Sequence, residues 1–193
     1  MENKGKFVLD DTNLWNDNAL TDRQTDRQLT LSDKVAEAQR ALILAAKMSK
    51  DYYHKPLIIT YSGGKDSDVM LHLAETCLNP TEYEVLNSHT TVDAPETVYH
   101  IRDTFKRLED KGIKATIDYH VENGKRITMW NLIPSKLMPP TRIVRYCCSI
   151  LKESGTPFRI AALGVRAEES SKRQGRDIFG IRGGIPGSYI FFS

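Results

Sequence analysis

Residues Pro56–Leu71 read Pro-Leu-Ile-Ile-Thr-Tyr-Ser-Gly-Gly-Lys-Asp-Ser-Asp-Val-Met-Leu and decide the fold of this chain. The first half is apolar and β-branched and opens with a proline, which is typical of a buried strand. From Ser67 onward, apolar residues recur at helical spacing. Between the two halves lies a short turn that contains Gly63 and Gly64. The stretch therefore predicts a strand, a glycine turn and the N-terminus of a helix.

A strand, a glycine turn and a helix N-terminus together form a binding site for an anion. The first backbone N–H groups of a helix have no partner inside the helix, and the helix dipole favours negative charge there. Glycines let the backbone approach a phosphate closely. The hydroxyls of Ser62 and Ser67 add hydrogen-bond donors, and Lys65 adds positive charge. A Walker A loop is excluded, because Asp66 follows the Gly-Lys pair where that loop needs Ser or Thr.

The motif Ser-Gly-Gly-x-Asp-Ser at residues 62–67 resembles the PP-loop of the N-type ATP pyrophosphatases and of the adenylyl-sulfate (APS) and phosphoadenylyl-sulfate (PAPS) reductases. Three further segments resemble the reductases in the same order and at similar separations. They are Pro-Glu-Thr at 95–97, the tandem-cysteine segment at 145–152, and Gly-x-Arg-x-x-Glu-Ser-x-x-Arg at 164–173. The chain is therefore similar to the PAPS/APS reductase family, within the PP-loop superfamily, over about residues 56–176.

The resemblance implies which side chains hold a nucleotide and which act on it. Lys65 and Arg166 would stabilise developing negative charge, and Asp66 would orient the loop or approach a metal ion, so these three are the candidate catalytic residues. The expected nucleotide-binding residues are Ser62, Gly63, Gly64, Lys65, Asp66, Ser67, Thr91, Glu96, Gly164, Arg166, Ser170 and Arg173.

The chain also departs from the family pattern. Residues 89–91 read His-Thr-Thr where the family usually has Asp-Thr-Gly, and Asp93 is a candidate replacement for the missing carboxylate. The cysteines are Cys77, Cys147 and Cys148, whereas a usual cubane iron–sulfur cluster needs four thiolates. We therefore expect no iron–sulfur cluster in this chain alone. The tandem pair stays open as thiol or cluster ligands, sulfur acceptors or packing residues, and no histidine spacing predicts a metal site.

Two reactions fit a nucleotide held by its phosphates. In one, ATP is attacked at its α-phosphorus, pyrophosphate leaves, and sulfur displaces the adenylyl group, with Mg²⁺ neutralising the leaving group. The resemblance to sulfur-inserting PP-loop enzymes, including DNA phosphorothioation proteins, implies this reaction, with nucleic acid or a sulfur-donor protein as partner. In the other, a thiolate attacks the sulfur of a sulfonucleotide (PAPS or APS) and sulfite is released. A third interpretation is a truncated, non-catalytic nucleotide-binding module.

Composition and charge indicate which cellular location and which binding partners to expect. With 40% hydrophobic and 27% charged residues, the 193-residue chain is typical of one globular domain. No apolar stretch approaches the roughly 20 residues of a membrane span, and no signal peptide is visible. We expect a cytoplasmic protein that forms a homo-oligomer. Residues 142–182 hold nine Lys/Arg and four acids, a net charge of +5 that fits a nucleotide or a nucleic-acid backbone.

Hydrophobic periodicity predicts an alternating order of helices and strands. We expect a polar lead-in at 1–30, a PP-loop domain at 31–182 and an irregular tail at 183–193. Strands separated by helices predict a Rossmann-like parallel twisted sheet with helices on both faces and the ligand at the carboxyl ends of the strands. The expected helices are 32–50, 66–78, 95–111, 127–137 and 147–152, and the expected strands are 57–61, 83–88, 113–121 and 158–163, with a turn at Asn123-Gly124.

Overall fold

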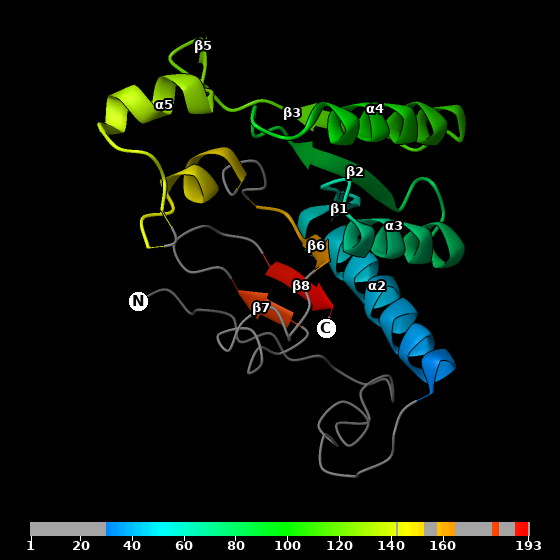
Figure 1. The fold of residues 1–193 in the computed structure, drawn as a ribbon. Coiled ribbons are helices and arrows are strands. Elements are labelled where there is room, and N and C mark those ends of the chain that lie inside the picture. Colours follow the sequence, from blue (N-terminus) through cyan, green and yellow to red (C-terminus); the bar gives the residue numbers. More distant parts are fainter. Residues whose placement is uncertain (1–29, 142, 153–157, 165–178, 182–187, 193) are drawn as a thin grey trace, which may run out of the picture.

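The structure is a computed structural model, which describes residues 30–141, 143–152, 158–164, 179–181 and 188–192. Its helices and strands form an α/β fold around a six-stranded sheet (Figure 1). The helices are α2 (Leu31–Tyr53), α3 (Lys65–Cys77), α4 (Pro95–Asp110), α5 (Met129–Lys136) and the π-helix η1 (Cys148–Lys152). The strands are β1 (Leu57–Thr60), β2 (Tyr83–Ser88), β3 (Ala115–Asp118), β4 (Val121–Glu122), β5 (Lys125–Arg126), β6 (Ala161–Gly164), β7 (Phe179–Ile181) and β8 (Ser188–Phe192).

The strand order of the sheet is β3-β2-β1-β6-β8-β7. Strands β3, β2, β1, β6 and β8 are parallel to their neighbours, and β7 pairs antiparallel with β8 at one edge. The chain runs outward from β1 through β2 to β3 and then returns to the other side of β1 as β6. The order therefore reverses between β1 and β6, and in parallel sheets ligands bind at the carboxyl ends of the strands at such a switch point.

The predicted α/β fold with a parallel sheet is confirmed, and the first predicted helix is observed as α2. Thr30 caps this helix, because its hydroxyl accepts the Asp33 N–H at 3.3 Å while the Asp33 carboxylate accepts the Thr30 N–H at 3.0 Å. This reciprocal capping box fixes where the helix begins. The predictions for residues 1–29 lie outside the described residues.

Two predicted segments are corrected by the structure. The single strand expected at 113–121 is divided into β3, which pairs with β2, and β4, which pairs with β5 in a hairpin. Asn123 and Gly124 have φ of 50° and 73°, which is the backbone of a two-residue hairpin turn. The predicted turn is thus confirmed. Because this turn pairs β4 with β5, the end of the expected strand lies in a separate two-stranded sheet and not in the main sheet.

The tail expected to be irregular, residues 183–193, contains the strand β8. This strand lies beside β6 in parallel register from Ala161↔Tyr189 to Gly164↔Phe192, so the sheet extends past the predicted boundary at residue 182. The sequence Ser-Tyr-Ile-Phe-Phe is rich in the aromatic and β-branched residues that favour strands. The prediction gave more weight to the preceding Gly-Gly-Ile-Pro-Gly and to the lack of a covering helix.

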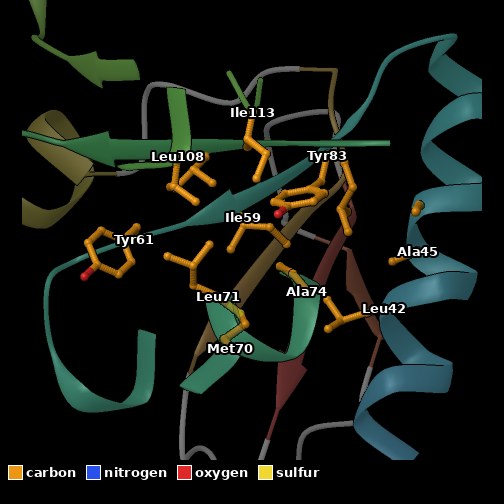
Figure 2. Close-up of a cluster of buried hydrophobic side chains, with 14 of the residues drawn as sticks. Leu42, Ala45, Ile59, Tyr61, Met70, Leu71, Ala74, Tyr83, Leu108 and Ile113 are labelled. Carbon is orange, nitrogen blue, oxygen red and sulfur yellow. The ribbon is translucent and has the colours of Figure 1, made fainter. Parts of the chain in front are cut away.

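The main core lies between one face of the sheet and helices α2, α3 and α4 (Figure 2). On the opposite face of the sheet, Ile58 and Ala161 form a second cluster, and Met129, Leu132 and Leu151 join α5 to η1 in a third. Within the described ranges, no helix has the length and apolar character that crossing a membrane requires. The labelled residues of the main core are Leu42, Ala45, Ile59, Tyr61, Met70, Leu71, Ala74, Tyr83, Leu108 and Ile113.

Candidate functional site

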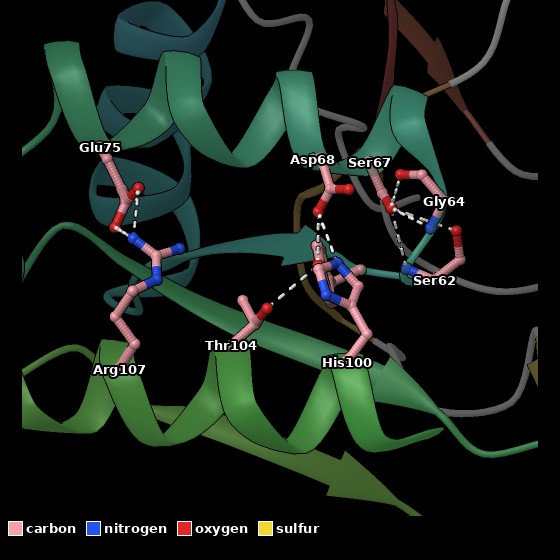
Figure 3. Close-up of polar contacts among 9 residues, drawn as sticks. Ser62, Gly64, Ser67, Asp68, Glu75, His100, Thr104 and Arg107 are labelled. Atoms are coloured by element: carbon pink, nitrogen blue, oxygen red, sulfur yellow. Dashed lines mark hydrogen bonds and ion pairs between the residues drawn. The ribbon is translucent and has the colours of Figure 1, made fainter. Parts of the chain in front are cut away.

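The turn between β1 and α3 is held in shape by the hydroxyl of Ser67 (Figure 3). Its oxygen lies 3.1 Å from the Gly64 N and 3.3 Å from the Ser62 N, which both donate to it. It also lies 3.2 Å from the Ser62 hydroxyl and donates its own proton to the Gly64 carbonyl at 2.7 Å. The turn therefore folds on its own hydrogen bonds, and Ser67 shapes the turn that is predicted to bind an anion.

The two glycines of the turn serve different purposes. Gly63 has φ +73°, and a Cβ built there would lie 2.9 Å from Ile101 Cγ1 and 3.1 Å from Thr97 Cγ2 on α4. Gly64 has φ −96°, which any residue can adopt, and its nearest neighbour would be Ser62 Oγ at 3.6 Å. Gly63 is thus required by conformation and packing, whereas Gly64 leaves space on the open side of the turn, where an anion can approach the backbone.

Gly164 brings the end of β6 against the first turn of α3. A Cβ at this position would lie 3.0 Å from the Asp66 carbonyl oxygen and 3.4 Å from the Ser67 N. The neighbouring atoms belong to the backbone, which yields less readily than a flexible side chain, so glycine is favoured at this position. The structure therefore brings together two predicted segments, the PP-loop and the start of the 164–173 motif.

A pocket of about 220 Å³ lies at the carboxyl ends of the strands, at the switch point between β1 and β6. It is bounded by the turn after β1, the end of β2 with the loop that follows, the end of β6, and the last residue of η1. Its lining residues are Thr60, Tyr61, Ser62, Ser67, Leu86, Asn87, Ser88, Thr90, Asp93, Lys152, Leu163 and Gly164. The end of the sheet predicted to bind the ligand thus carries a pocket that reaches the N-terminus of α3.

The predicted site residues divide into three groups. Ser62, Ser67 and Gly164 line the pocket, whereas Gly63, Gly64, Lys65 and Asp66 lie on the same turn without lining it. Thr91 and Glu96 lie on the loop after β2 and in the first turn of α4, outside the lining. Arg166, Ser170 and Arg173 lie outside the described residues.

The structure adds pocket residues that the sequence motifs did not identify. The Asn87 side chain is buried and donates to the Tyr61 carbonyl at 2.8 Å, which joins the end of β2 to the start of the turn. A polar residue in the last positions of an apolar strand was the available signal. Asp93, suspected as a replacement carboxylate, lines the pocket and accepts the Thr90 hydroxyl at 2.6 Å. Lys152 adds a cation from η1.

Behind the turn, a polar network links β1, α3 and α4 (Figure 3). The Tyr61 hydroxyl donates to the Asp68 carboxylate at 2.5 Å and lies 2.9 Å from His100 Nε2 and 3.4 Å from the Thr104 hydroxyl. Burial and the hydrogen bond to Asp68 raise the pKa of Tyr61 to about 12. Because this side chain belongs to the residue that enters the turn, the network fixes the turn relative to both helices.

Thr91 connects the loop beside the pocket to α5. Its φ of +68° is unusual for a β-branched residue, and it is maintained by two contacts. The Thr91 N–H donates to His89 Nδ1 at 3.0 Å, and the Thr91 hydroxyl accepts the N–H of Met129, the first residue of α5, at 3.0 Å. Burial, together with the positive charge of Arg126, lowers the pKa of His89. A neutral His89 is the form that accepts the Thr91 N–H.

The three cysteines belong to two different parts of the fold. Cys77 packs against the main core, and Cys147 packs against the cluster that joins α5 and η1. Burial and the neighbouring Cys148 raise the pKa of Cys147, while Arg145 Nη2 donates to the Cys148 sulfur at 3.4 Å. In the part of the chain that the structure describes, no three His, Cys, Asp or Glu side chains come close enough to hold a metal ion.

Three solved structures with similar folds are distant from this chain in sequence. The NH3-dependent NAD synthetase of Campylobacter jejuni is 14% identical (TM-score 0.45; 73% of this chain and 59% of that chain covered). Candida glabrata FMN adenylyltransferase in complex with ATP is 16% identical (TM-score 0.42; 86% and 53%), and Candida auris PAPS reductase in a phosphate complex is 13% identical (TM-score 0.43; 84% and 79%). The chain thus spans between half and three fifths of the first two proteins, and likeness at this level carries no inference about function.

The family comparison is more specific. No curated protein sequence matches the chain. The family described as phosphoadenosine phosphosulfate reductase domain matches residues 56–192, which include the PP-loop, the pocket and the last strand of the sheet. The match begins at the proline that opens β1 and covers well over half of the chain. This chain belongs to the phosphoadenosine phosphosulfate reductase family.

Proposed function

We propose that this protein binds a sulfonucleotide, PAPS or APS, by its phosphates at the PP-loop and takes part in transfer of its sulfonyl group. The observation that supports this most is the continuity between the N-terminus of α3 and the pocket at the switch point of the sheet. The N-terminus of α3 would bind the phosphates through its backbone N–H groups, and the pocket would provide space for the rest of the nucleotide. The family match supports the sulfonucleotide as the ligand.

In this proposal the backbone of the turn and three basic side chains bind the phosphates of the nucleotide. The backbone of the turn and the first turn of α3 receive the phosphate oxygens. The exposed Lys65 at the start of α3 and Lys152 at the rim of the pocket supply positive charge from two sides. Arg166 is proposed as a further phosphate ligand from its place in the 164–173 motif, because a guanidinium can bind a phosphate in bidentate fashion.

The chemistry would begin with a thiolate that attacks the sulfur atom of the sulfonucleotide. The bond between this sulfur and the phosphate oxygen breaks, so that the nucleoside phosphate leaves and a thiosulfonate remains on the attacking thiol. A second thiol then forms a disulfide with the first and releases sulfite. Positive charge at Lys65 would stabilise the phosphate as it leaves. Cys148 and a partner's thiol are the two candidate nucleophiles.

A second candidate, cleavage of ATP to an adenylate and pyrophosphate, is favoured by one observation. The Asp93 carboxylate lines the pocket, and Mg²⁺ bound to phosphates needs only one or two protein carboxylates. The donor set therefore fits this ion, with Asp93 as the residue that would hold it. Mg²⁺ would neutralise the charge of the leaving pyrophosphate. Sulfur transfer to an acceptor such as nucleic acid would follow the same adenylation.

Product analysis separates these reactions. The protein is incubated in turn with PAPS, APS and ATP, with dithiothreitol and Mg²⁺, and sulfite and pyrophosphate are measured. We expect sulfite from a sulfonucleotide, and none from the Gly64→Asp variant, whose added carboxylate would repel the phosphates. Pyrophosphate from ATP without sulfite from PAPS or APS would favour the second candidate. Binding without either product would refute both reactions.

A further inference from the structure

A second charged region lies on α5 and the segments around it, and it extends to Lys152, which lines the nucleotide pocket. Residues 121–152 hold six Lys/Arg and a single acid, Glu122, which gives a net charge of +5 in a chain whose total is +2. The carboxylate of Glu122 lies 3.0 Å from His120 Nε2. Lys125, Arg126 and Lys136 are exposed. This part of the molecule is therefore a concentrated source of positive charge.

Between these cations, α5 presents large apolar side chains to solvent. One face of the helix is buried, with Met129 and Leu132 in the cluster that joins α5 to η1. On the outer side, the Trp130 residue is 74% exposed, and Leu137, directly after the helix, is 92% exposed. Trp130 and Leu137 are seven residues apart, or about two helical turns, and a group of exposed apolar side chains rimmed by charged residues indicates a binding surface.

The cations lie at both ends of the exposed tryptophan's helix. Arg126 precedes α5 and is tied to it, because the Asn131 side chain donates to the Arg126 carbonyl at 3.0 Å. Lys136 is the last residue of α5. A helix of eight residues is about 12 Å long. A strand stacked as in duplex DNA advances roughly 3.4 Å per nucleotide and an unstacked strand advances further, so this length spans at most three or four nucleotides.

We propose that this α5 surface, formed by Lys125, Arg126, Trp130, Lys136 and Leu137, binds a single strand of nucleic acid. One unpaired base stacks on the Trp130 indole, and phosphates on either side contact the basic residues at the two ends of α5. A single strand is required, since the bases of a duplex are already stacked on one another. An exposed aromatic ring with cations at both ends of its helix matches a polyanion that carries bases better than an acidic protein patch.

The α5 surface is also joined to the nucleotide pocket. The first N–H of α5 donates to Thr91, whose neighbour Thr90 lines the pocket. At the other end of the segment, Lys152 lines the same pocket. A strand bound along α5 would therefore end close to the bound nucleotide. The proposal concerns binding and stands whether or not the proposed reaction occurs.

The test uses fluorescein-labelled dT20 and the full chain in 50 mM salt, with anisotropy and tryptophan emission as readouts. We expect saturable binding that quenches tryptophan emission. Trp130→Ala should weaken binding about fivefold to a hundredfold, because stacking contributes that much per base. The matched control is Tyr99→Ala, which removes another exposed aromatic, 62% exposed on α4. Thermal unfolding checks that both variants fold.

Salt dependence tests the phosphate contacts. Lys136→Glu should weaken binding and reduce the slope of log K against log salt by at least about 0.7, the value for one phosphate contact on a single strand. Lys106→Glu, the same charge change at an exposed position of α4, should leave both unchanged. Equal losses in Trp130→Ala and Tyr99→Ala would overturn the proposal. So would a duplex, poly-glutamate or vesicles of anionic lipid that bind as tightly as dT20, or the absence of binding to dT20.

Discussion

The adjacent glycines of the PP-loop should differ strongly in their response to the same substitution. In Gly63→Ala, the new Cβ would occupy a backbone with φ +73° and lie 2.9 Å from Ile101 Cγ1 and 3.1 Å from Thr97 Cγ2. The left-handed backbone costs about 1–2 kcal/mol for an L-residue, and displacing packed side chains costs about 1–3 kcal/mol. Restriction of the unfolded chain returns about 0.4–1 kcal/mol, so we expect a loss of stability of about 1–5 kcal/mol.

In Gly64→Ala, the backbone is already in an ordinary extended conformation and the nearest atom to the new Cβ is 3.6 Å away. We expect the free energy of unfolding to stay within about 1 kcal/mol of the parent, because the reduced entropy of the unfolded chain favours Ala, whereas the N-cap position of Gly64 favours Gly over Ala.

Thermal and urea unfolding of both variants measure the difference. For a domain of this size, Gly63→Ala should lower the Tm by roughly 2–20 °C, at about 2–4 °C per kcal/mol. Gly64→Ala serves as the matched control, since it adds the same methyl group one residue away. A Gly63→Ala variant as stable as the parent, or a Gly64→Ala variant that is the less stable of the two, would refute the described geometry of the turn.

Three further predictions concern ionisation, the pocket and the thiols. Burial raises the pKa of Tyr61 and of Tyr83 to about 12, above the value near 10 in the unfolded chain. Both tyrosines therefore stabilise the fold fully below pH 10 and lose this contribution as the pH rises toward 12. Urea unfolding at about pH 9 to 12 should show this decline in the free energy of unfolding, and a Tyr61→Phe/Tyr83→Phe double variant should show a smaller decline. Lys152→Met should weaken nucleotide binding by about 1 kcal/mol, or roughly fivefold, measured by calorimetry, and unchanged affinity would place the lysine away from the phosphates. Anaerobic reconstitution with iron and sulfide should leave the isolated chain without a stoichiometric cluster, because Cys77 packs in a different cluster from Cys147, and about four irons per chain would contradict this.

Much of the fold could be predicted because its local signals agree with one another. The apolar run before Gly63 and the helical spacing after Ser67 predicted β1 and α3, and the Asn123-Gly124 pair predicted a turn that the backbone confirms. The strand β8 was missed, because its partner β6 is far away in the sequence and short strands carry only a weak local signal.

The candidate site was predictable where a motif marks it. The Ser62–Ser67 turn and Gly164 were found from their patterns, and the structure adds the close backbone contact that favours glycine at position 164. Asn87 and Lys152 were missed, because each lines the pocket through the arrangement of the sheet and belongs to no local pattern. Only tertiary structure places the end of β2 beside the last residue of η1.

Calorimetric titration of ATP, APS and PAPS into the parent chain and two Gly64 variants tests the central claim, that the PP-loop holds the phosphates of an adenine nucleotide. We predict saturable binding of at least one nucleotide, near one per chain, to the parent and to Gly64→Ala. Gly64→Asp has the same room for its Cβ but carries a carboxylate on the open side of the turn, so it should fold and show no binding. Parent-like affinity in Gly64→Asp, or no binding of any of the three nucleotides to the parent, would contradict the claim.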